Sequence, residues 1–394
     1  MTDDNKTDWL GLCFGIMEEY IPSACEERED AARFMQISVH AETVTQYYSS
    51  SCKEKDAAVK VGEMFEKIGE HYDECGVFDN VLNNYQRSLE IKKEHLGEKH
   101  SEVAVLFDNI GLFYTKTGKF IEAVDWHNKA IALFEEVLGK NDLDTAIAYN
   151  NLGLAFEKQG KYKLAIEWYQ KSLDIDEAVL GFEHIDTAAD YNNIGAAYLL
   201  NGEYETALEY LIKARDIKET LVGKKHPNTA ITYNNLGSVN WRMKNYDEAL
   251  KYTEKSLDIY KETYGENHPG TALAYGNIAA ILADKGDREE AKRLIKLSIE
   301  LGKSMIGLFH PDTAKNYYNI GTILFDADKA AQALPYFLLA YKLYEKVVDN
   351  QHVDFIRVIK HLESTHKKLG IEEPFLEWMA REVSVSLEEL ETAV

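Results

Sequence analysis

The sequence predicts an all-α fold: a solenoid assembled from one repeated pair of helices. Three sets of residues recur at a fixed interval of 42 positions, namely an asparagine, a small residue two positions later and an alanine fourteen positions after the asparagine. A period of this length is typical of helical repeat arrays, in which each unit packs on its neighbours. We call the recurring asparagines the asparagine row: Asn109, Asn151, Asn193, Asn235, Asn277 and Asn319.

Each repeat is expected to contain two amphipathic helices joined by a glycine. In the third repeat, Tyr149, Leu152 and Phe156 recur at the spacing of one helix face within residues 145–160. A second helix is expected over about residues 163–180. Because the linker between them is short, the two helices must pack antiparallel.

The linkers between repeats carry signals for helix ends. Leu-Gly pairs such as Leu180-Gly181 predict a helix end, because glycine readily adopts the left-handed conformation found there. The segment His-Pro-Asn-Thr-Ala that begins at His226 predicts the next helix start, since proline is favoured in the first turn and polar side chains cap free amides. The linker histidines are His100, His184, His226, His268 and His310.

Geometry argues against a metal site along these histidines. Equivalent residues on successive layers lie at least about 8–10 Å apart, whereas zinc needs several ligands near ~2 Å. We therefore expect the histidines to serve in loops and helix caps, and we expect no metal and no other cofactor.

Composition limits the classes of partner. The 394 residues include 44 Lys and Arg against 67 Asp and Glu, and the resulting net charge of −23 repels nucleic acid and anionic lipid surfaces. No apolar run approaches the roughly 18 residues of a membrane span. We therefore expect a cytoplasmic protein that binds neither nucleic acid nor membrane. The cysteines fit no zinc pattern: Cys13, Cys25, Cys52 and Cys75.

The repeat resembles the tetratricopeptide repeat, whose pattern is an aromatic residue, Leu-Gly, a second aromatic residue and an alanine. The period of 42 residues and the linker Leu-Gly-x-x-His-Pro-x-Thr-Ala resemble the long repeats of kinesin light chains and nephrocystin-3-like proteins. The resemblance implies a right-handed superhelical solenoid of helix-turn-helix repeats with helical caps. In the third repeat the matching residues are Tyr149, Leu152, Gly153, Phe156 and Ala165.

The phase of the linker histidines divides the chain into three parts. Residues 59–352 are expected to form seven repeats of 42 residues. Residues 353–394 fit one degenerate repeat that caps the C-terminal end. Residues 1–58 are out of phase and are expected to form an N-terminal helical cap or a small effector module.

The asparagine row is the predicted functional feature, because asparagine is a poor helix former that solvent exposure alone does not require. In tetratricopeptide proteins the corresponding stripe lines the concave groove, so the resemblance implies that these carboxamides face a ligand. A carboxamide can donate and accept hydrogen bonds, which suits contact with the backbone of an extended peptide. Hydrogen bonding between repeats is the alternative, and the two roles are compatible. The predicted peptide-binding set also includes Asn150, Asn192 and Asn234.

One helical position that flanks the asparagine row is basic in the early repeats and acidic in the late ones. The aromatic residue Trp241 lies beside it. We therefore expect an extended ligand with acidic residues toward the early repeats and an aromatic or basic residue toward the late ones. The residues at this position are Lys116, Lys158 and Arg242, followed by Asp284 and Asp326.

The sequence contains no phosphate-binding loop, nucleophile elbow or zinc-protease motif, so we expect no enzymatic activity. The leading interpretation is a scaffold or adaptor that binds an extended peptide segment of a partner protein in the concave groove. The alternative is a ligand-switched, peptide-sensing regulator in which residues 1–58 act as the effector. A third interpretation makes residues 1–58 an oligomerisation or docking segment, and the oligomeric state stays open.

Overall fold

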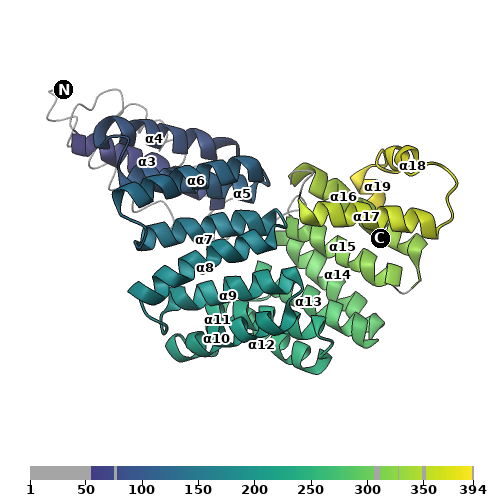
Figure 1. Cartoon of the computed structure of the whole chain (residues 1–394). Coiled ribbons are helices and arrows are strands. Elements are labelled where there is room, and N and C mark those ends of the chain that lie inside the picture. The colour runs from purple at the N-terminus through teal and green to yellow at the C-terminus, as the bar shows by residue number, and fades with distance from the viewer. Residues whose placement is uncertain (1–54, 75–77, 306–310, 327, 348–351, 393–394) are drawn as a thin grey trace. The chain divides into compact units, whose positions relative to one another are not determined.

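Figure 1 shows the computed structural model of the chain, in which all regular elements of the described residues are helices. This confirms the predicted all-α solenoid. The predicted N-terminal module up to residue 54, the four cysteines and His310 lie outside the described residues. The described residues are 55–74, 78–305, 311–326, 328–347 and 352–392.

The helices follow one another in antiparallel pairs, as the two-helix repeat predicts. The short 3-10 helix η1 (Phe78–Asn80) precedes α4, and the chain ends in α17 (Val353–Lys368), α18 (Phe375–Glu382) and α19 (Leu387–Thr392). The pairs are α3 (Lys55–Glu74) and α4 (Val81–Leu96), α5 (Ser101–Lys116) and α6 (Phe120–Val137), α7 (Leu143–Lys158) and α8 (Tyr162–Val179), α9 (Ile185–Asn201) and α10 (Tyr204–Leu221), α11 (Pro227–Arg242) and α12 (Tyr246–Tyr264), α13 (Pro269–Lys285) and α14 (Arg288–Met305), and α15 (Pro311–Asp326) and α16 (Ala330–Val347).

The chain divides into two compact units within α7, between Asn151 and Leu152. The N-terminal unit contains α3 to α6, except for the turn at residues 117–120, together with the first part of α7. The C-terminal unit contains that turn, the rest of α7 and helices α8 to α19. Each unit is described by itself below.

A glycine on the first helix of a repeat lets the second helix approach closely. A Cβ atom added at Gly153 would lie 2.7 Å from the ring of Tyr169, and one at Gly195 would lie 2.7 Å from Cγ of Leu211. Tyr169 and Leu211 are buried core residues, so neither has free space to move into. The small residue of the 42-residue pattern is therefore a packing requirement of the helix pair.

Each linker is closed by hydrogen bonds that account for its sequence. Gly223 has a φ of 96°, in the left-handed region that favours glycine. The hydroxyl of the buried Thr229 donates to the carbonyl oxygen of Gly223 at 2.9 Å, and Nδ1 of His226 accepts from the backbone N–H of Asn228 at 3.1 Å. The predicted capping role of the histidines is thereby confirmed. The same cap is made by His100, His184, His268 and His352.

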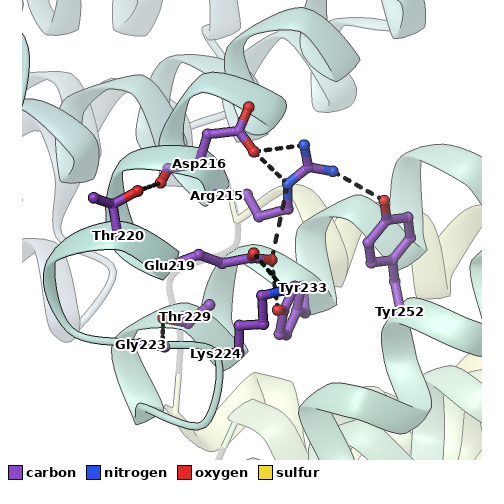
Figure 2. A network of polar contacts seen from close by, with 9 residues as sticks. All are labelled: Arg215, Asp216, Glu219, Thr220, Gly223, Lys224, Thr229, Tyr233 and Tyr252. Carbon is purple, nitrogen blue, oxygen red and sulfur yellow. Dashed lines mark hydrogen bonds and ion pairs between the residues drawn. The ribbon is translucent and has the colours of Figure 1, made fainter.

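Successive repeats are joined by a second set of polar contacts, shown in Figure 2 between α10, α11 and α12. The hydroxyl of Tyr233 donates to Glu219 at 2.7 Å, and the guanidinium of Arg215 donates to the hydroxyl of Tyr252 at 3.0 Å. Burial and the Glu219 carboxylate raise the pKa of Tyr233, so this phenol stays protonated as a donor. Equivalent bonds link Tyr149 to Glu135 and Tyr191 to Glu177.

Candidate functional site

The first helices of the repeats lie on the inner side of the C-terminal unit. Among the described residues, α9 contacts α11, α11 contacts α13 and α13 contacts α15, whereas successive second helices such as α10 and α12 make at most marginal contacts. An array of stacked helices curves toward the side on which neighbouring layers lie closest together. We use the term inner face for the side of α9, α11 and α13 that carries the asparagine row.

In the C-terminal unit the asparagine row bonds one repeat to the next. Nδ2 of Asn235 donates to Oδ1 of Asn192 at 3.1 Å, and Nδ2 of Asn277 donates to Oδ1 of Asn234 at 2.7 Å. Each donor lies 43 positions after its acceptor, so it reaches the residue before the equivalent asparagine of the preceding repeat. Asn192 and Asn234, which were predicted as ligand contacts, are the acceptors here.

In the N-terminal unit the acceptors that lie 43 positions before the asparagines are carboxylates. Nδ2 of Asn109 donates to Oε1 of Glu66 at 3.1 Å, and Nδ2 of Asn151 donates to Oδ2 of Asp108 at 2.6 Å. A carboxylate can only accept, so it fixes which end of each carboxamide points to the preceding repeat. Hydrogen bonding between repeats, the alternative left open by the sequence, therefore holds for four members of the row.

The inter-repeat bonds do not exhaust the hydrogen-bonding capacity of the row. All six asparagines are half-buried. Nδ2 of Asn109 also donates to Oε1 of Glu70 at 3.4 Å. The carboxamides of Asn235 and Asn277 each donate one hydrogen bond to the preceding repeat, and a carboxamide has a second hydrogen and an oxygen with which to bond further partners. The last member, Asn319, follows Gly276 by 43 positions, and glycine offers no side-chain acceptor. Asn150 and Asn193 are likewise half-buried.

The charges predicted to flank the row are partly engaged by the protein itself. The ammonium of Lys116 lies 3.2 Å from the carboxylate of Asp73 and donates to its backbone carbonyl at 2.9 Å. The Lys158 ammonium is exposed and lies 3.7 Å from Glu157.

Trp241 and Arg242 lie together at the end of α11. The indole N–H of Trp241 donates to Oδ2 of Asp284 at 2.7 Å, and the guanidinium carbon of Arg242 lies 4.3 Å from the centre of the indole ring. The late acidic position represented by Asp284 is thus already bonded to the preceding repeat.

The inner face also presents apolar side chains that the predicted site lacks. Leu200 is 40% exposed and Ile231 is 45% exposed, although both are large and apolar. Leu200 occupies the same repeat position as Lys158 and Arg242, so the 42-residue phase could have identified it. Helix α11 carries no charged residue before Arg242, and α13 carries none before Asp284. The middle of this face is therefore apolar and amide-bearing rather than charged.

The part of the chain that the structure describes shows neither a metal cluster nor a membrane-spanning helix. Within those residues, no three or more His, Cys, Asp or Glu side chains gather where they could hold a metal ion. None of the helices described there combines the length and apolarity that crossing a membrane requires.

These features define a helical repeat protein in which each unit has hydrogen-bonded asparagines on the first helices of its repeats. The tetratricopeptide repeat family matches residues 102–178, 186–262, 230–304 and 272–346. Together these segments cover more than half of the chain, and the protein belongs to the tetratricopeptide repeat family. A comparison with curated proteins finds no match.

Two solved structures with TM-scores above 0.5 share the fold. The apo form of RapI has 19% sequence identity and a TM-score of 0.56, covering 77% of this chain and 99% of its own. A Rap protein complexed with Competence and Sporulation Factor has 15% identity and a TM-score of 0.52, covering 86% and 97%. Nearly identical TPR-like repeats of a kinesin light chain from Podosopora anserina have 20% identity and a TM-score of 0.44, covering 52% and 97%.

Proposed function

We propose that the protein is an interaction scaffold that binds an extended peptide segment of a partner along its inner face. The observation that carries this proposal is the asparagine row, in which Asn235 and Asn277 of the inner face are held in place by bonds between repeats. Groups held in position before binding lose little conformational entropy when a ligand arrives. The remaining donor and acceptor atoms of Asn235 and Asn277 match the alternating N–H and C=O groups of an extended backbone.

The residues around the asparagine row indicate which side chains the ligand should carry. Leu200 and Ile231 offer exposed apolar surface beside Asn193 and Asn235, so we expect apolar ligand side chains there. Because Lys116 and Asp284 are already bonded within the protein, the charge preference falls mainly on Lys158 and Arg242. The proposed ligand is an extended, mainly apolar segment with acidic residues near these two cations.

The test uses peptides selected on the full-length protein from a displayed library of random twelve-residue peptides. Leu200→Glu and Ile231→Glu place a carboxylate on the inner face without removing an inter-repeat bond. We expect at least a tenfold loss of affinity for the selected peptides, measured by fluorescence anisotropy. The matched control is Leu221→Glu, at a residue 46% exposed at the end of α10, which should bind as wild type does.

Two further outcomes decide the proposal. Charge reversal of Arg242 should weaken the binding of acidic selected peptides severalfold at low salt, and the loss should shrink as salt is added. If the selected peptides bind both inner-face variants and the control equally, the inner face is not the binding surface.

The second candidate function is a ligand-switched regulator with residues 1–58 as its effector. It is favoured by the likeness to the two Rap structures, which covers 77% and 86% of this chain and shows a shared fold. Small-angle scattering with and without a selected peptide separates the candidates. A switch compacts measurably on binding, whereas a passive scaffold keeps its radius of gyration.

A further inference from the structure

Two buried aspartates face each other where the third repeat meets the fourth. Asp176 lies on α8 and Asp190 on α9, and their exposed fractions are 7% and 4%. Helices α8 and α9 are in extensive contact, so both side chains lie inside the joint between the two repeats.

Each of the two buried carboxyl groups perturbs the pKa of the other, so the two groups interact across the joint. Two carboxylates can only accept hydrogen bonds, so a favourable contact between these two groups needs one proton. Ser172 supplies a further hydrogen bond to Asp190, while Oδ2 of Asp190 is buried without a hydrogen-bond partner. The joint therefore buries two acidic groups with few partners other than each other and Ser172.

The groups around the pair do not supply a permanent positive charge. On α9, Asp186 adds negative charge, and His184, 39% exposed, caps the helix by accepting from the Asp186 N–H. On α8 the titratable neighbour is the phenol of Tyr169, whose pKa is raised by burial, by Glu157 of α7 and by Asp190, so it stays neutral. Burial and the neighbouring Asp176 raise the pKa of Asp190 to about 8, and burial raises the pKa of Asp176.

The pair is particular to this joint. The equivalent positions one repeat earlier hold Phe134 and Ala148, which are apolar. One repeat later they hold Lys218 and Thr232, whose side chains bond at 3.1 Å. Two carboxyl groups meet at this position only between α8 and α9.

We propose that Asp176 and Asp190 form a proton-operated joint in the array: the contact between α8 and α9 is firm while the pair shares a proton and loosens when that proton is lost. The joint is built into the fold, and it does not depend on the peptide binding proposed above. Its consequence is regulatory, because α9 carries Asn192 and Asn193 of the inner face.

The direction of the pH effect follows from proton uptake. In the unfolded chain both groups ionise near the ordinary aspartate pKa of 3.8, whereas the folded pair keeps one proton up to about pH 8. Folding therefore binds a proton between these values. The joint is most stable below about pH 4. Between about pH 4 and pH 8 the equilibrium constant for its local folding falls by up to tenfold per pH unit, and above about pH 8 it changes no further.

Hydrogen exchange measured by mass spectrometry on the full-length chain tests the proposal. Protection factors of α8 and α9, corrected for intrinsic exchange rates, are compared at about pH 5.5 and pH 8 with those of α16 in the same sample. We expect protection of α8 and α9 to fall at least tenfold more than that of α16.

Variants separate the pair from other titrating groups. Asp190→Asn can donate to Asp176 permanently and should keep α8 and α9 protected at pH 8. Asp176→Asn gives the same answer if the first variant does not fold. The matched control is Asp174→Asn, at an exposed aspartate on α8, which should behave as wild type. Equal protection of the wild type at both pH values, or an unchanged loss in both pair variants, overturns the proposal.

Discussion

The two units build the same row of inter-repeat bonds from different chemistry. In the N-terminal unit, Asn151 donates to the carboxylate of Asp108, which also bonds at 2.6 Å to the ring of the fully buried His127. In the C-terminal unit, Asn235 donates to the neutral carboxamide of Asn192. The geometry is shared, but only the first arrangement ties the row to a buried network of ionisable groups.

A second position shows the same contrast. Lys92 and Lys218 occupy equivalent places in their repeats, and both are buried. Lys92 bonds to Glu66 at 2.5 Å and lies 3.1 Å from Glu102, whereas Lys218 bonds to the hydroxyl of Thr232. One site in the repeat therefore accommodates a buried ammonium either beside carboxylates or beside a neutral hydroxyl. We expect substitutions at these two lysines to have opposite effects on stability.

The largest expected effect is a difference in sign between Lys92→Met and Lys218→Met. Removing Lys92 leaves Glu66 buried without its partner and should destabilise the N-terminal unit by about 3–5 kcal/mol. Removing Lys218 relieves about 3 kcal/mol of charge burial and loses about 1 kcal/mol of hydrogen bonding, for a net gain of about 2 kcal/mol. Urea unfolding measures both, with hydrogen exchange to assign each change to a unit. Losses in both variants would remove the contrast.

The pH dependence of Lys218 provides the control. Burial lowers the pKa of Lys218 to about 8 from 10.5, so the unfolded chain binds more protons between these values. Stability of the C-terminal unit should therefore rise as pH increases from about 8 to about 10.5. Lys218→Met should lack this rise when the two proteins are compared by urea midpoint.

The next effect separates the two kinds of acceptor in the asparagine row. Asp108→Ala leaves two buried or half-buried donors, on His127 and Asn151, without their acceptor and should cost about 3 kcal/mol. Asn192→Ala leaves only the amide of Asn235 and should cost about 1 kcal/mol. Equal costs in urea unfolding would show that the carboxylate adds nothing to the bond. Asp108→Asn, which keeps an acceptor for Asn151, should lie between the two.

The smallest effect is the loss of one helix cap, which should cost the same free energy of unfolding in both units. His100 caps α5 in the N-terminal unit and His226 caps α11 in the C-terminal unit, each by accepting a backbone N–H. Replacing either by alanine removes one cap and should cost about 1 kcal/mol. Local hydrogen exchange in α5 and α11 measures the two losses. A much larger loss in one unit would mean that its linker does more than cap a helix.

The fold could be predicted from the sequence because each helix boundary has a local cause. Gly223, His226 and Thr229 act within one linker, so their spacing in sequence is also their spacing in space. The partners of the asparagine row could not be predicted in this way. They depend on how one repeat rotates over the next, which brings position 43, and not 42, beneath each carboxamide.

The buried ionisable groups were not predicted from the sequence, although residues at equivalent repeat positions indicate them. The position of Lys92 is occupied by Phe134, Asp176, Lys218 and Tyr260 in the following repeats. Ionisable residues at a site where aromatic side chains also fit indicate a buried polar contact. Whether this contact stabilises or destabilises the fold depends on whether an opposite charge lies beside it. Only the structure shows that.

The closed linker has a consequence for how such a chain can change in length. Because Thr229 bonds back to Gly223 and His226 to its own helix start, the turn needs nothing from distant repeats to form. If 42 residues were duplicated or deleted, the new junction would therefore contain a linker that forms its turn locally. A duplication or deletion would instead change which ionisable residues meet between neighbouring repeats. Buried charge, and not backbone geometry, therefore limits which repeats can pack against each other.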